Sequence, residues 1–370
     1  MKILMTTEPD DTHALLVKFA LESRSHQVTL LFTADHPTRQ TNTIVFDAAG
    51  YHWKSSDDCG LHVADDFDVV WWRRPRKPHI PKTQAHPRDY AFMVRENRLF
   101  FDSLTDNFAP NAWWINCKRA ATRATSKLTQ LNLAQQSGMP IPKTLCSNDP
   151  DDIRAFIREN QRHGVIYKPL CANFWFDDQQ VRVTYTAKVD LALLTSNLQL
   201  QMTPGIYQKE VKKRYELRII CFGDYLIAVK INSQNHAAGK IDWRAIPEAS
   251  LQVEPYNLPS KLENQIRRFM KQLGLVFGSM DFIVDEAGNY FFLEVNEQGQ
   301  FLWVEQYLPE VKVLDIFVQF LLQRSTTFAW SPTRADFAIH QYERELAAHL
   351  SENLKHHVCL NHAAAYNALG

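Results

Sequence analysis

Apolar and polar residues along the first part of the chain predict the order strand, helix, strand. An apolar run at 2–7 predicts a strand, apolar positions at helical spacing in 11–23 predict a helix, and a second apolar run follows at 27–32. This order favours a parallel sheet with helices packed against it. Further elements expected in this part are a strand at 68–75, a helix at 88–106 and a strand at 112–116.

The rest of the chain mixes amphipathic helices with short alternating strands. A helix is predicted at 121–137, where Gly138 and Pro140 end it, and another at 259–273, which Gly274 ends. The other elements expected here are a helix at 150–162, a strand at 164–169, an aromatic run at 174–176 leading to an alternating strand at 181–185, strands at 206–211, 216–222 and 225–232, and a helix at 311–324.

The composition is typical of a globular protein and argues against several classes of partner. With 370 residues, 45% of them apolar and 22% charged, the chain is long enough for two or three domains. Lys plus Arg equals Asp plus Glu at 41 each, so neither nucleic acid nor a membrane is indicated as a partner. The N-terminal segment becomes acidic too early for a signal peptide. Six cysteines without a Cys-x-x-Cys pair favour free thiols, so we expect a cytoplasmic protein.

The segment from Asp281 to Asn296 combines a hairpin pattern with candidate metal ligands. Two short apolar strands are joined by the turn residues Glu-Ala-Gly-Asn, and Asp281 is expected to open the first strand. Because side chains alternate along a strand, Glu294 and Asn296 lie on one face, and strand pairing would bring Asp281 to the same patch. Two carboxylates and an amide oxygen suit Mg²⁺, which also binds nucleotide phosphates. The alternative is a sheet whose polar face only meets water.

Four cationic residues are candidates for binding phosphate. Lys168 lies within a predicted strand, where its ammonium group either contacts an anion or extends into solvent at a sheet edge, and Lys127 is the second lysine candidate. Arg218 shares a strand face with Glu216, which also fits a solvated ion pair, and Arg244 follows a polar loop. Arginine suits transferring phosphoryl oxygens because it stays charged and forms bidentate hydrogen bonds. Together with the metal candidates, these residues favour a nucleoside triphosphate.

The order of these motifs resembles that of the ATP-grasp superfamily. The motifs are the strand containing Lys168, the segment 208–211, Glu216-Leu-Arg218, Asp281 and Glu294-x-Asn296. More narrowly, the chain resembles the ATP-grasp ligases that mature ribosomally made peptides of the microviridin (graspetide) type. This narrower resemblance is carried by Trp71-Trp-Arg-Arg-Pro75 and by the segment 298–305.

The resemblance implies an α/β (α+β) fold in which two sheets hold ATP between them. It implies an N-terminal parallel α/β domain at 1–116 and a central ATP-grasp domain with a peptide-docking hairpin at 117–205. A C-terminal ATP-grasp domain with the Mg²⁺ and ATP site would follow at 206–328, with a helical tail at 329–370.

The same resemblance implies a role for each candidate residue of the nucleotide site. Asp281, Glu294 and Asn296 would bind Mg²⁺, and Lys127 and Lys168 would bind ATP phosphates. A hinge would read the adenine edge through its backbone; its residues are Gln208, Lys209, Glu210 and Val211.

Three further residues would act around the hinge and the reacting phosphate. Glu216 would reach towards the ribose. Arg218 and Arg244 would act catalytically by stabilising the γ-phosphate and the acyl phosphate formed from it. Glu297 and Glu305 are candidate general bases, each with a structural role as the alternative.

The implied partner is a precursor peptide with a leader and a core. Its leader would dock on the hairpin after Lys168, and the residues implied for docking are Phe174, Trp175, Arg182 and Tyr185. The alternative is that these aromatic residues pack against the core of their own domain. A homodimer is also compatible with the resemblance.

The implied activity is ATP-dependent ligation. Asp or Glu side chains of the precursor would become acyl phosphates, and Ser, Thr or Lys side chains would then form ester or amide cross-links. The first alternative is an ATP-grasp ligase that joins amino acids or adds residues to a protein terminus. The second is a module that binds ATP as a signal, without ligation.

Overall fold

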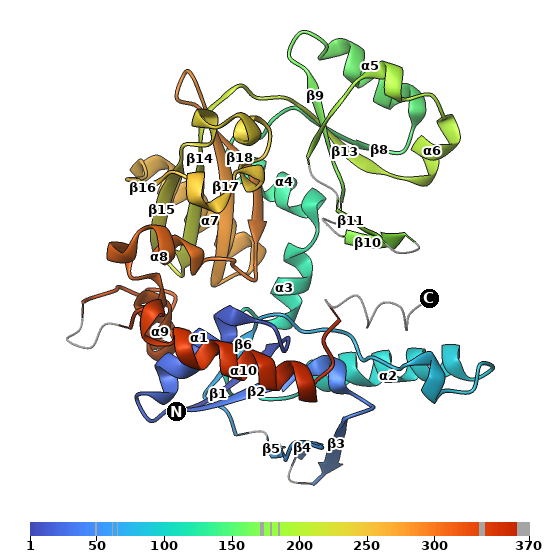
Figure 1. Cartoon of the computed structure of the whole chain (residues 1–370), viewed down its shortest axis with the longest axis vertical. Helices are drawn as coiled ribbons and strands as arrows, with labels where there is room; N and C mark the ends of the chain where they lie inside the picture. The colour runs from blue at the N-terminus through green and yellow to red at the C-terminus, as the bar shows by residue number, and fades with distance from the viewer. Residues whose placement is uncertain are drawn as a thin grey trace. The chain divides into compact units, whose positions relative to one another are not determined.

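The computed structural model describes residues 1–370 apart from 49, 61, 65, 171–173, 178–179, 184–185, 333–336 and 361–370. For 62–64, 174–177, 180–183 and 193 it describes the backbone only. The chain forms two compact units, one made of Met1–Ala121 with Gln300–Gly370 and one made of Thr122–Gly299 (Figure 1). No helix in the described part of the chain has the length and apolar character that crossing a membrane requires.

The first unit is built on a four-stranded parallel sheet in the order β2-β1-β6-β7. Asp11 caps the first helix by accepting a hydrogen bond from the backbone N–H of His13 at 3.1 Å. The parallel sheet and the β-α-β opening predicted from the sequence are confirmed. The elements of this layer are β1 (Lys2–Thr7), α1 (Thr12–Glu22), β2 (Gln27–Phe32), β6 (Val69–Trp72), α2 (Tyr90–Thr105) and β7 (Trp113–Ile115).

An antiparallel meander, absent from the predicted elements, lies between β2 and β6 in the chain. It consists of β3 (Gln40–Asp47), β4 (Gly50–Asp57) and β5 (His62–Ala64). The strand β3 is largely exposed, and its apolar run of three residues, Ile44-Val45-Phe46, is too short to predict a strand. Trp53 of β4 is 2% exposed and packs in an aromatic cluster with Phe108, whose ring centroid is 4.8 Å away.

The C-terminal part of the chain completes the first unit. Its helices are α8 (Trp303–Tyr307), α9 (Val313–Gln323) and α10 (Glu343–His356). Phe317 of α9 packs against Trp71 of β6, with ring centroids 4.6 Å apart. Glu305, a candidate base in the sequence, accepts hydrogen bonds from the backbone N–H groups of Leu314 at 2.8 Å and Ile339 at 3.0 Å. These bonds give Glu305 a structural role in joining segments of this unit.

The second unit contains a small antiparallel sheet in the order β12-β9-β13-β8. One face of this sheet packs on an apolar cluster that includes Phe156, Leu200 and Tyr207. The elements are β8 (Thr144–Ser147), α5 (Pro150–Glu159), β9 (Val165–Lys168), β12 (Ala187–Val189), α6 (Asn197–Met202) and β13 (Gly205–Lys209), with the separate hairpin β10 (Phe174–Asp177) and β11 (Gln180–Val183).

A five-stranded antiparallel sheet forms the rest of the second unit, in the order β16-β15-β14-β17-β18. The apolar side of α7 packs on the sheet, and Phe269 lies 5.0 Å from Phe292 between ring centroids. Gly274 ends this helix with a φ of 82°, a left-handed conformation that glycine adopts without strain. The elements are β14 (Lys213–Phe222), β15 (Tyr225–Ile231), β16 (Val253–Pro255), α7 (Ser260–Leu273), β17 (Phe277–Asp285) and β18 (Tyr290–Asn296).

Two local predictions in this unit are wrong. The helix expected at 121–137 is two helices, α3 (Lys118–Ala124) and α4 (Lys127–Gln136), because Ser126 caps the second by accepting from the backbone N–H of Thr129 at 3.3 Å. Asp281 does not open its strand but lies in the middle of β17, since the preceding residues 277–280 are also extended and buried. The turn between β17 and β18 is where the sequence predicted it.

Candidate active site

Three charged residues form a row across three neighbouring strands of the five-stranded sheet, β14, β17 and the edge strand β18. Arg218 of β14 pairs directly with Asp281 of β17, and Asp281 pairs directly with Glu294 of β18. Directly paired residues of neighbouring strands point to the same face of a sheet, so all three side chains share one face. The opposite face is core, as the 1% exposure of Leu217 and the complete burial of Phe282 show. The predicted meeting of Asp281 and Glu294 is therefore found.

Arg218, Arg244 and Lys127 contact the two carboxylates of this row. Arg218 Nη1 donates to Asp281 Oδ1 at 2.8 Å, and Arg244 Nη2 donates to Asp281 Oδ2 at 3.1 Å and to Glu294 Oε1 at 3.4 Å. Lys127 Nζ donates to Glu294 Oε2. Five of the sequence-predicted residues are thus in one connected group, although they come from α4, β14, β17, β18 and a loop.

The position of Lys127 follows from how α4 is attached to β18. Gln130 of α4 is 2% exposed, and its Nε2 donates to the Val295 carbonyl at 3.0 Å while its Oε1 accepts from the Val295 N–H at 2.9 Å. These two bonds fix the first turn of α4 beside Glu294. Burial opposes ionisation of Glu294, but the charges of Lys127 and Arg244 outweigh it and lower its pKa from 4.5 to about 2. Gln130 was not predicted; its only signal is a polar residue among the buried positions of α4.

Arg244 lies on a short 3₁₀ turn, Trp243–Ala245, that Asp242 caps by accepting from the Arg244 N–H at 3.1 Å. Its side chain is 45% exposed, in contrast to the 4% exposure of the Arg218 side chain. Burial works against the charge of Arg244, yet Asp281, Asp242 and Glu294 together raise its pKa. Arg244 is therefore a charged and accessible side chain at the edge of the group.

Lys168 is the last residue of β9 and pairs with Ile206 of β13. Burial lowers its pKa; the charges of Lys127 and Arg244 act in the same direction, whereas Glu294 and Glu216 oppose them. The Lys168 ammonium group is therefore within electrostatic range of Glu294 and Glu216. The alternative of a lysine extending into solvent at a sheet edge is not supported, because β9 is an inner strand and burial governs the pKa of Lys168.

The predicted hinge begins at the end of β13 and continues into the loop before β14. Gln208 is 2% exposed; its Nε2 donates to Thr144 Oγ1 at 3.0 Å, and its buried Oε1 has no partner among the described residues. The Lys209 N–H donates to the Lys143 carbonyl at 2.9 Å, and the Glu210 N–H donates to the Gly164 carbonyl at 3.0 Å. Val211 follows in the same loop. Gln208 lies on the same face of its sheet as Lys168, because it is two residues from the Lys168 partner.

Glu216 is not part of a solvated ion pair with Arg218. It is 6% exposed and accepts from Lys213 Nζ at 2.7 Å. Burial raises the pKa of Glu216, and the nearby Lys213 charge opposes that effect. Its partner Lys213, which the sequence did not single out, is three residues earlier on β14.

Asn296, the third predicted metal ligand, ends β18. Its Oδ1 accepts from the backbone N–H groups of Gln298 at 3.0 Å and Gly299 at 3.2 Å. The side chain thus stabilises the turn after β18, with Ser279 of β17 directly opposite in the sheet. Ser279 is fully buried, and its hydroxyl has no partner in the part of the chain that the structure describes.

The side chains of this site fit a magnesium nucleotide. Each carboxylate oxygen of the row already contacts a cationic side chain, so a metal ion at the carboxylates would release those cations towards phosphate oxygens. Gln208 Oε1 is a buried acceptor that matches an amino donor such as that of adenine. No group of three or more His, Cys, Asp or Glu side chains suited to a metal occurs among the described residues. A metal here would therefore rely on Asp281, Glu294 and non-acidic oxygens.

The predicted docking residues lie largely beyond what the structure describes. Phe174 pairs with Val183 and Trp175 with Arg182 in the hairpin of β10 and β11, so the predicted hairpin exists. Their side chains and all of Tyr185 lie outside the described residues.

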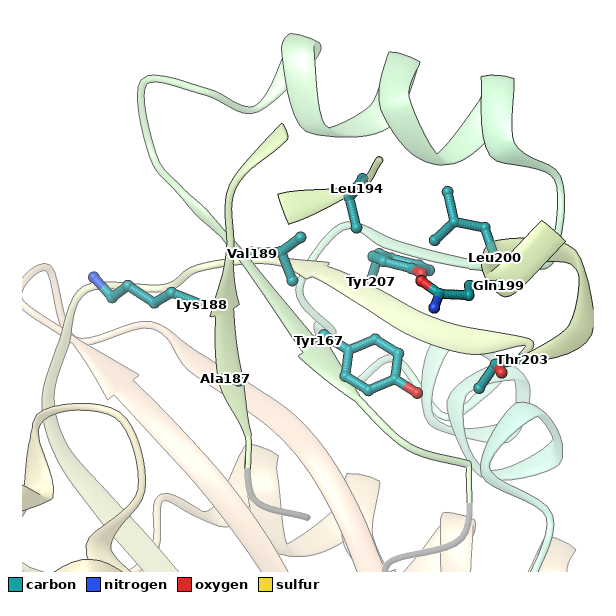
Figure 2. A pocket seen from close by; sticks show the side chains of 9 residues that line it. All are labelled: Tyr167, Ala187, Lys188, Val189, Leu194, Gln199, Leu200, Thr203 and Tyr207. Atoms are coloured by element: carbon teal, nitrogen blue, oxygen red, sulfur yellow. The ribbon is translucent and has the colours of Figure 1, made fainter. Parts of the chain in front are cut away.

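A cavity of about 320 Å³ lies against the face of the small sheet that carries Tyr167 and Tyr207 (Figure 2). Its wall is completed by residues of β12 and α6, including Val189 and Leu200. Alternation along β9 and β13 places Lys168 and Gln208 on the opposite face. The cavity therefore lies on the face of the sheet opposite these two candidate residues.

Comparison with known proteins supports the fold. No family model and no curated protein matches the sequence. Among solved structures, the chain is similar to macrocyclase MdnC of Microcystis aeruginosa MRC, solved with precursor peptide MdnA, at 26% identity and a TM-score of 0.76 over 87% of this chain and 100% of that one. Macrocyclase MdnB of the same organism matches at 26% identity and a TM-score of 0.72 over 87% and 99%.

A third similar structure is a RiPP-associated ATP-grasp ligase of Chryseobacterium gregarium, solved with ADP and with a leader and core peptide. It is 23% identical, with a TM-score of 0.78 over 91% of this chain and 99% of that one. These matches span nearly the whole length of the relatives, and they confirm the α+β ATP-grasp fold expected from the motifs. This chain therefore has the ATP-grasp fold, and its structure is similar to those of macrocyclases and ligases associated with ribosomally made peptides.

Proposed function

We propose that the protein is an ATP-dependent carboxylate ligase that forms cross-links within a ribosomally made precursor peptide. The observation that carries this proposal is the row of Arg218, Asp281 and Glu294 with Lys127 and Arg244 bound to it. Buried and partly buried charges of both signs in direct contact are what a site for a metal-bound polyphosphate needs.

Residue roles in this proposal follow from the contacts. Asp281 and Glu294 would hold Mg²⁺ together with Asn296, and the ion would neutralise charge on the phosphate oxygens. Lys127 and Lys168 would bind phosphate, while the hinge from Gln208 to Val211 would bind adenine and Glu216 would lie towards the ribose. The buried Gln208 Oε1 would accept a hydrogen bond from the adenine amino group.

Arg218 and Arg244 would act on the reacting phosphoryl group. A carboxylate of the substrate attacks the γ-phosphate, ADP leaves, and an acyl phosphate forms. A hydroxyl or amine of the same peptide then attacks the acyl carbon, inorganic phosphate leaves, and an ester or amide remains. Both arginines stay charged throughout, so they stabilise negative charge on the transferring oxygens before and after the transfer.

A precursor peptide is the proposed substrate because solved relatives were captured with such peptides. MdnC is bound with the precursor MdnA, and the Chryseobacterium ligase with a leader and a core. We propose that the leader docks at the hairpin of β10 and β11, through Phe174, Trp175, Arg182 and Tyr185. A Trp175→Ala variant that binds and modifies the precursor normally would contradict this docking site.

The proposal also keeps the remaining expectations from the sequence. The ranges 1–116, 117–205, 206–328 and 329–370 would act as functional domains, and the protein would function in the cytoplasm, with a homodimer as the possible assembly. The cysteines of the described residues are free, which agrees with a reducing compartment.

Mass spectrometry tests the proposal directly. The peptide encoded beside this gene is incubated with the purified protein, ATP and Mg²⁺, and a Glu294→Gln variant serves as the inactive control. Loss of one water mass per link, with ATP consumed, is the expected result. No mass change, with ATP consumed only when amino acids or another protein are supplied, would instead favour a ligase acting on those acceptors.

A further inference from the structure

The carboxyl ends of β1 and β6 meet where the connections of the parallel sheet diverge. The chain after β1 passes through α1 to β2 on one side, and the chain after β6 passes through α2 to β7 on the other. In open parallel sheets, ligands bind in the crevice at such a switch point. The motif that follows β6, Arg73-Arg74-Pro75, has no role in the nucleotide site proposed above.

Arg73 and Asp11 form a buried inner layer at this switch point. Arg73 is fully buried and Asp11 is 2% exposed; Arg73 Nε donates to Asp11 Oδ2 at 2.9 Å and Arg73 Nη2 to Asp11 Oδ1 at 3.4 Å. Thr7 Oγ1 also donates to Asp11 Oδ2, at 2.8 Å. Burial opposes the charge of Asp11, but Arg73 outweighs it and lowers the pKa of this carboxyl. The inner layer is a satisfied ion pair that supports the residues above it.

The outer layer consists of two arginines on one buried carboxylate. Glu8 Oε1 lies 3.1 Å from Arg74 Nε and 2.6 Å from Arg76 Nη2, so both arginines form an ion pair with this carboxylate. The Glu8 side chain is 1% exposed, whereas the side chains of Arg74 and Arg76 are 23% and 38% exposed. Solvent therefore reaches the two arginine side chains of this outer layer and not the Glu8 carboxylate.

The backbone holds both arginines in place. The Arg74 N–H donates to the Thr6 carbonyl at 3.1 Å, which extends the pairing of β1 and β6. The Arg76 N–H donates to Thr33 Oγ1 at 2.7 Å, and Thr33 is fully buried. Two guanidinium groups held at fixed positions by one carboxylate are preorganised to bind a second carboxylate.

We propose that Glu8, Arg74 and Arg76 form a recognition site for an acidic side chain of the substrate peptide. The assignment of the ligand to a peptide rests on the proposed function. Its assignment as a carboxylate rests on the planar guanidinium group of arginine, whose parallel N–H groups match the two oxygens of a carboxylate. The bound side chain is an anchor and is not the carboxylate that reacts with ATP. The site thereby selects peptides with an Asp or Glu at a fixed position.

Fluorescence anisotropy on the full-length protein tests the site. The probes are two fluorescein-labelled synthetic peptides of Thr, Ala and Glu that are identical except that one carries Gln for every Glu. A charge-assisted hydrogen bond contributes enough that we expect the wild type to bind the Glu peptide about 10- to 100-fold more tightly. This preference should disappear in the double variant Arg74→Gln, Arg76→Gln, and should be unchanged in Arg98→Gln, an exposed arginine of α2 in the same unit.

A second double variant, Arg74→Lys with Arg76→Lys, keeps the positive charges beside Glu8 but removes the guanidinium groups that bind a carboxylate through two parallel hydrogen bonds. It should retain the wild-type melting temperature and lose most of the preference, which keeps the test usable if the Gln variant does not fold. An undiminished preference for the Glu peptide in either folded variant would overturn the inference. Wild-type protein that shows the preference but never modifies a precursor would overturn the proposed function and leave the carboxylate site standing.

Discussion

The substitution Glu294→Gln removes one carboxylate from the centre of the site and keeps the size of the side chain. In the wild type, Glu294 contacts Lys127 and Arg244. The lowering of its pKa from 4.5 to about 2 corresponds to roughly 3 kcal/mol at 1.36 kcal/mol per pH unit. Because the side chain is 32% exposed, solvent screening reduces the expected contribution to about 1–2 kcal/mol.

The direction of the pH effect follows from this lowered pKa. The stabilisation by ionised Glu294 is fully present above its unfolded-state pKa near 4.5 and is lost as the pH falls towards 2. At pH 7 the variant should therefore melt about 2–8 °C below the wild type, and at pH 3 the gap should narrow. ATP turnover at pH 7 should be abolished, because the variant lacks a proposed ligand of the metal.

Thermal melting at the two pH values and an ADP-release assay measure these outcomes. Glu286→Gln, in the exposed turn of the same hairpin, is the matched control and should change neither. Unchanged turnover in Glu294→Gln would refute the metal role. A melting gap that does not narrow at low pH would refute the assignment of the stabilisation to ionised Glu294.

Three further variants address other parts of the second unit. Burial lowers the pKa of Lys168, and a bound phosphate should raise this pKa again, so nucleotide binding at alkaline pH below 10.5 should be accompanied by proton uptake. Calorimetry in buffers of different ionisation enthalpy should detect this uptake in the wild type and not in Lys168→Met. Arg244→Ala should lower kcat at least tenfold while changing ATP affinity less, as steady-state and binding measurements would show; a loss of affinity alone would make Arg244 a ground-state binder. A Cβ at Gly205 would lie 2.2 Å from the ring of Tyr167, so Gly205→Ala should lower the free energy of unfolding in urea by about 1–3 kcal/mol. An unchanged unfolding midpoint would show that the Tyr167 ring moves aside at no cost.

Local patterns predicted the site better than they predicted its surroundings. Alternation along β18 and the turn before it were enough to bring Asp281 and Glu294 together, because strand geometry is local. The ion pairs were beyond such reasoning: Lys127 reaches Glu294 across 167 positions of sequence, and only the attachment of α4 to β18 explains that contact.

Elements with a short apolar run or none were the ones missed. The exposed strand β3 has only Ile44-Val45-Phe46, and the short strands β8, β12 and β16 carry no strong hydrophobic pattern, so pairing with neighbouring strands forms them. The single helix expected at 121–137 failed for a related reason, because its apolar spacing continues across Ser126 while the cap at this residue interrupts the backbone. For Glu216, the alternative of a solvated ion pair with Arg218 is not found, since its ion-pair partner Lys213 lies earlier on the same strand.

The first unit is built from the N-terminal and the C-terminal parts of the chain, and this has a consequence for folding during synthesis. The sheet strand β6 rests on Phe317 of α9, whereas the second unit is continuous from Thr122 to Gly299. During translation the ribosome therefore releases the whole second unit before the first unit has its α9 helix. We expect the nascent second unit to fold first. The N-terminal strands keep an uncovered apolar face until α9 has been synthesised.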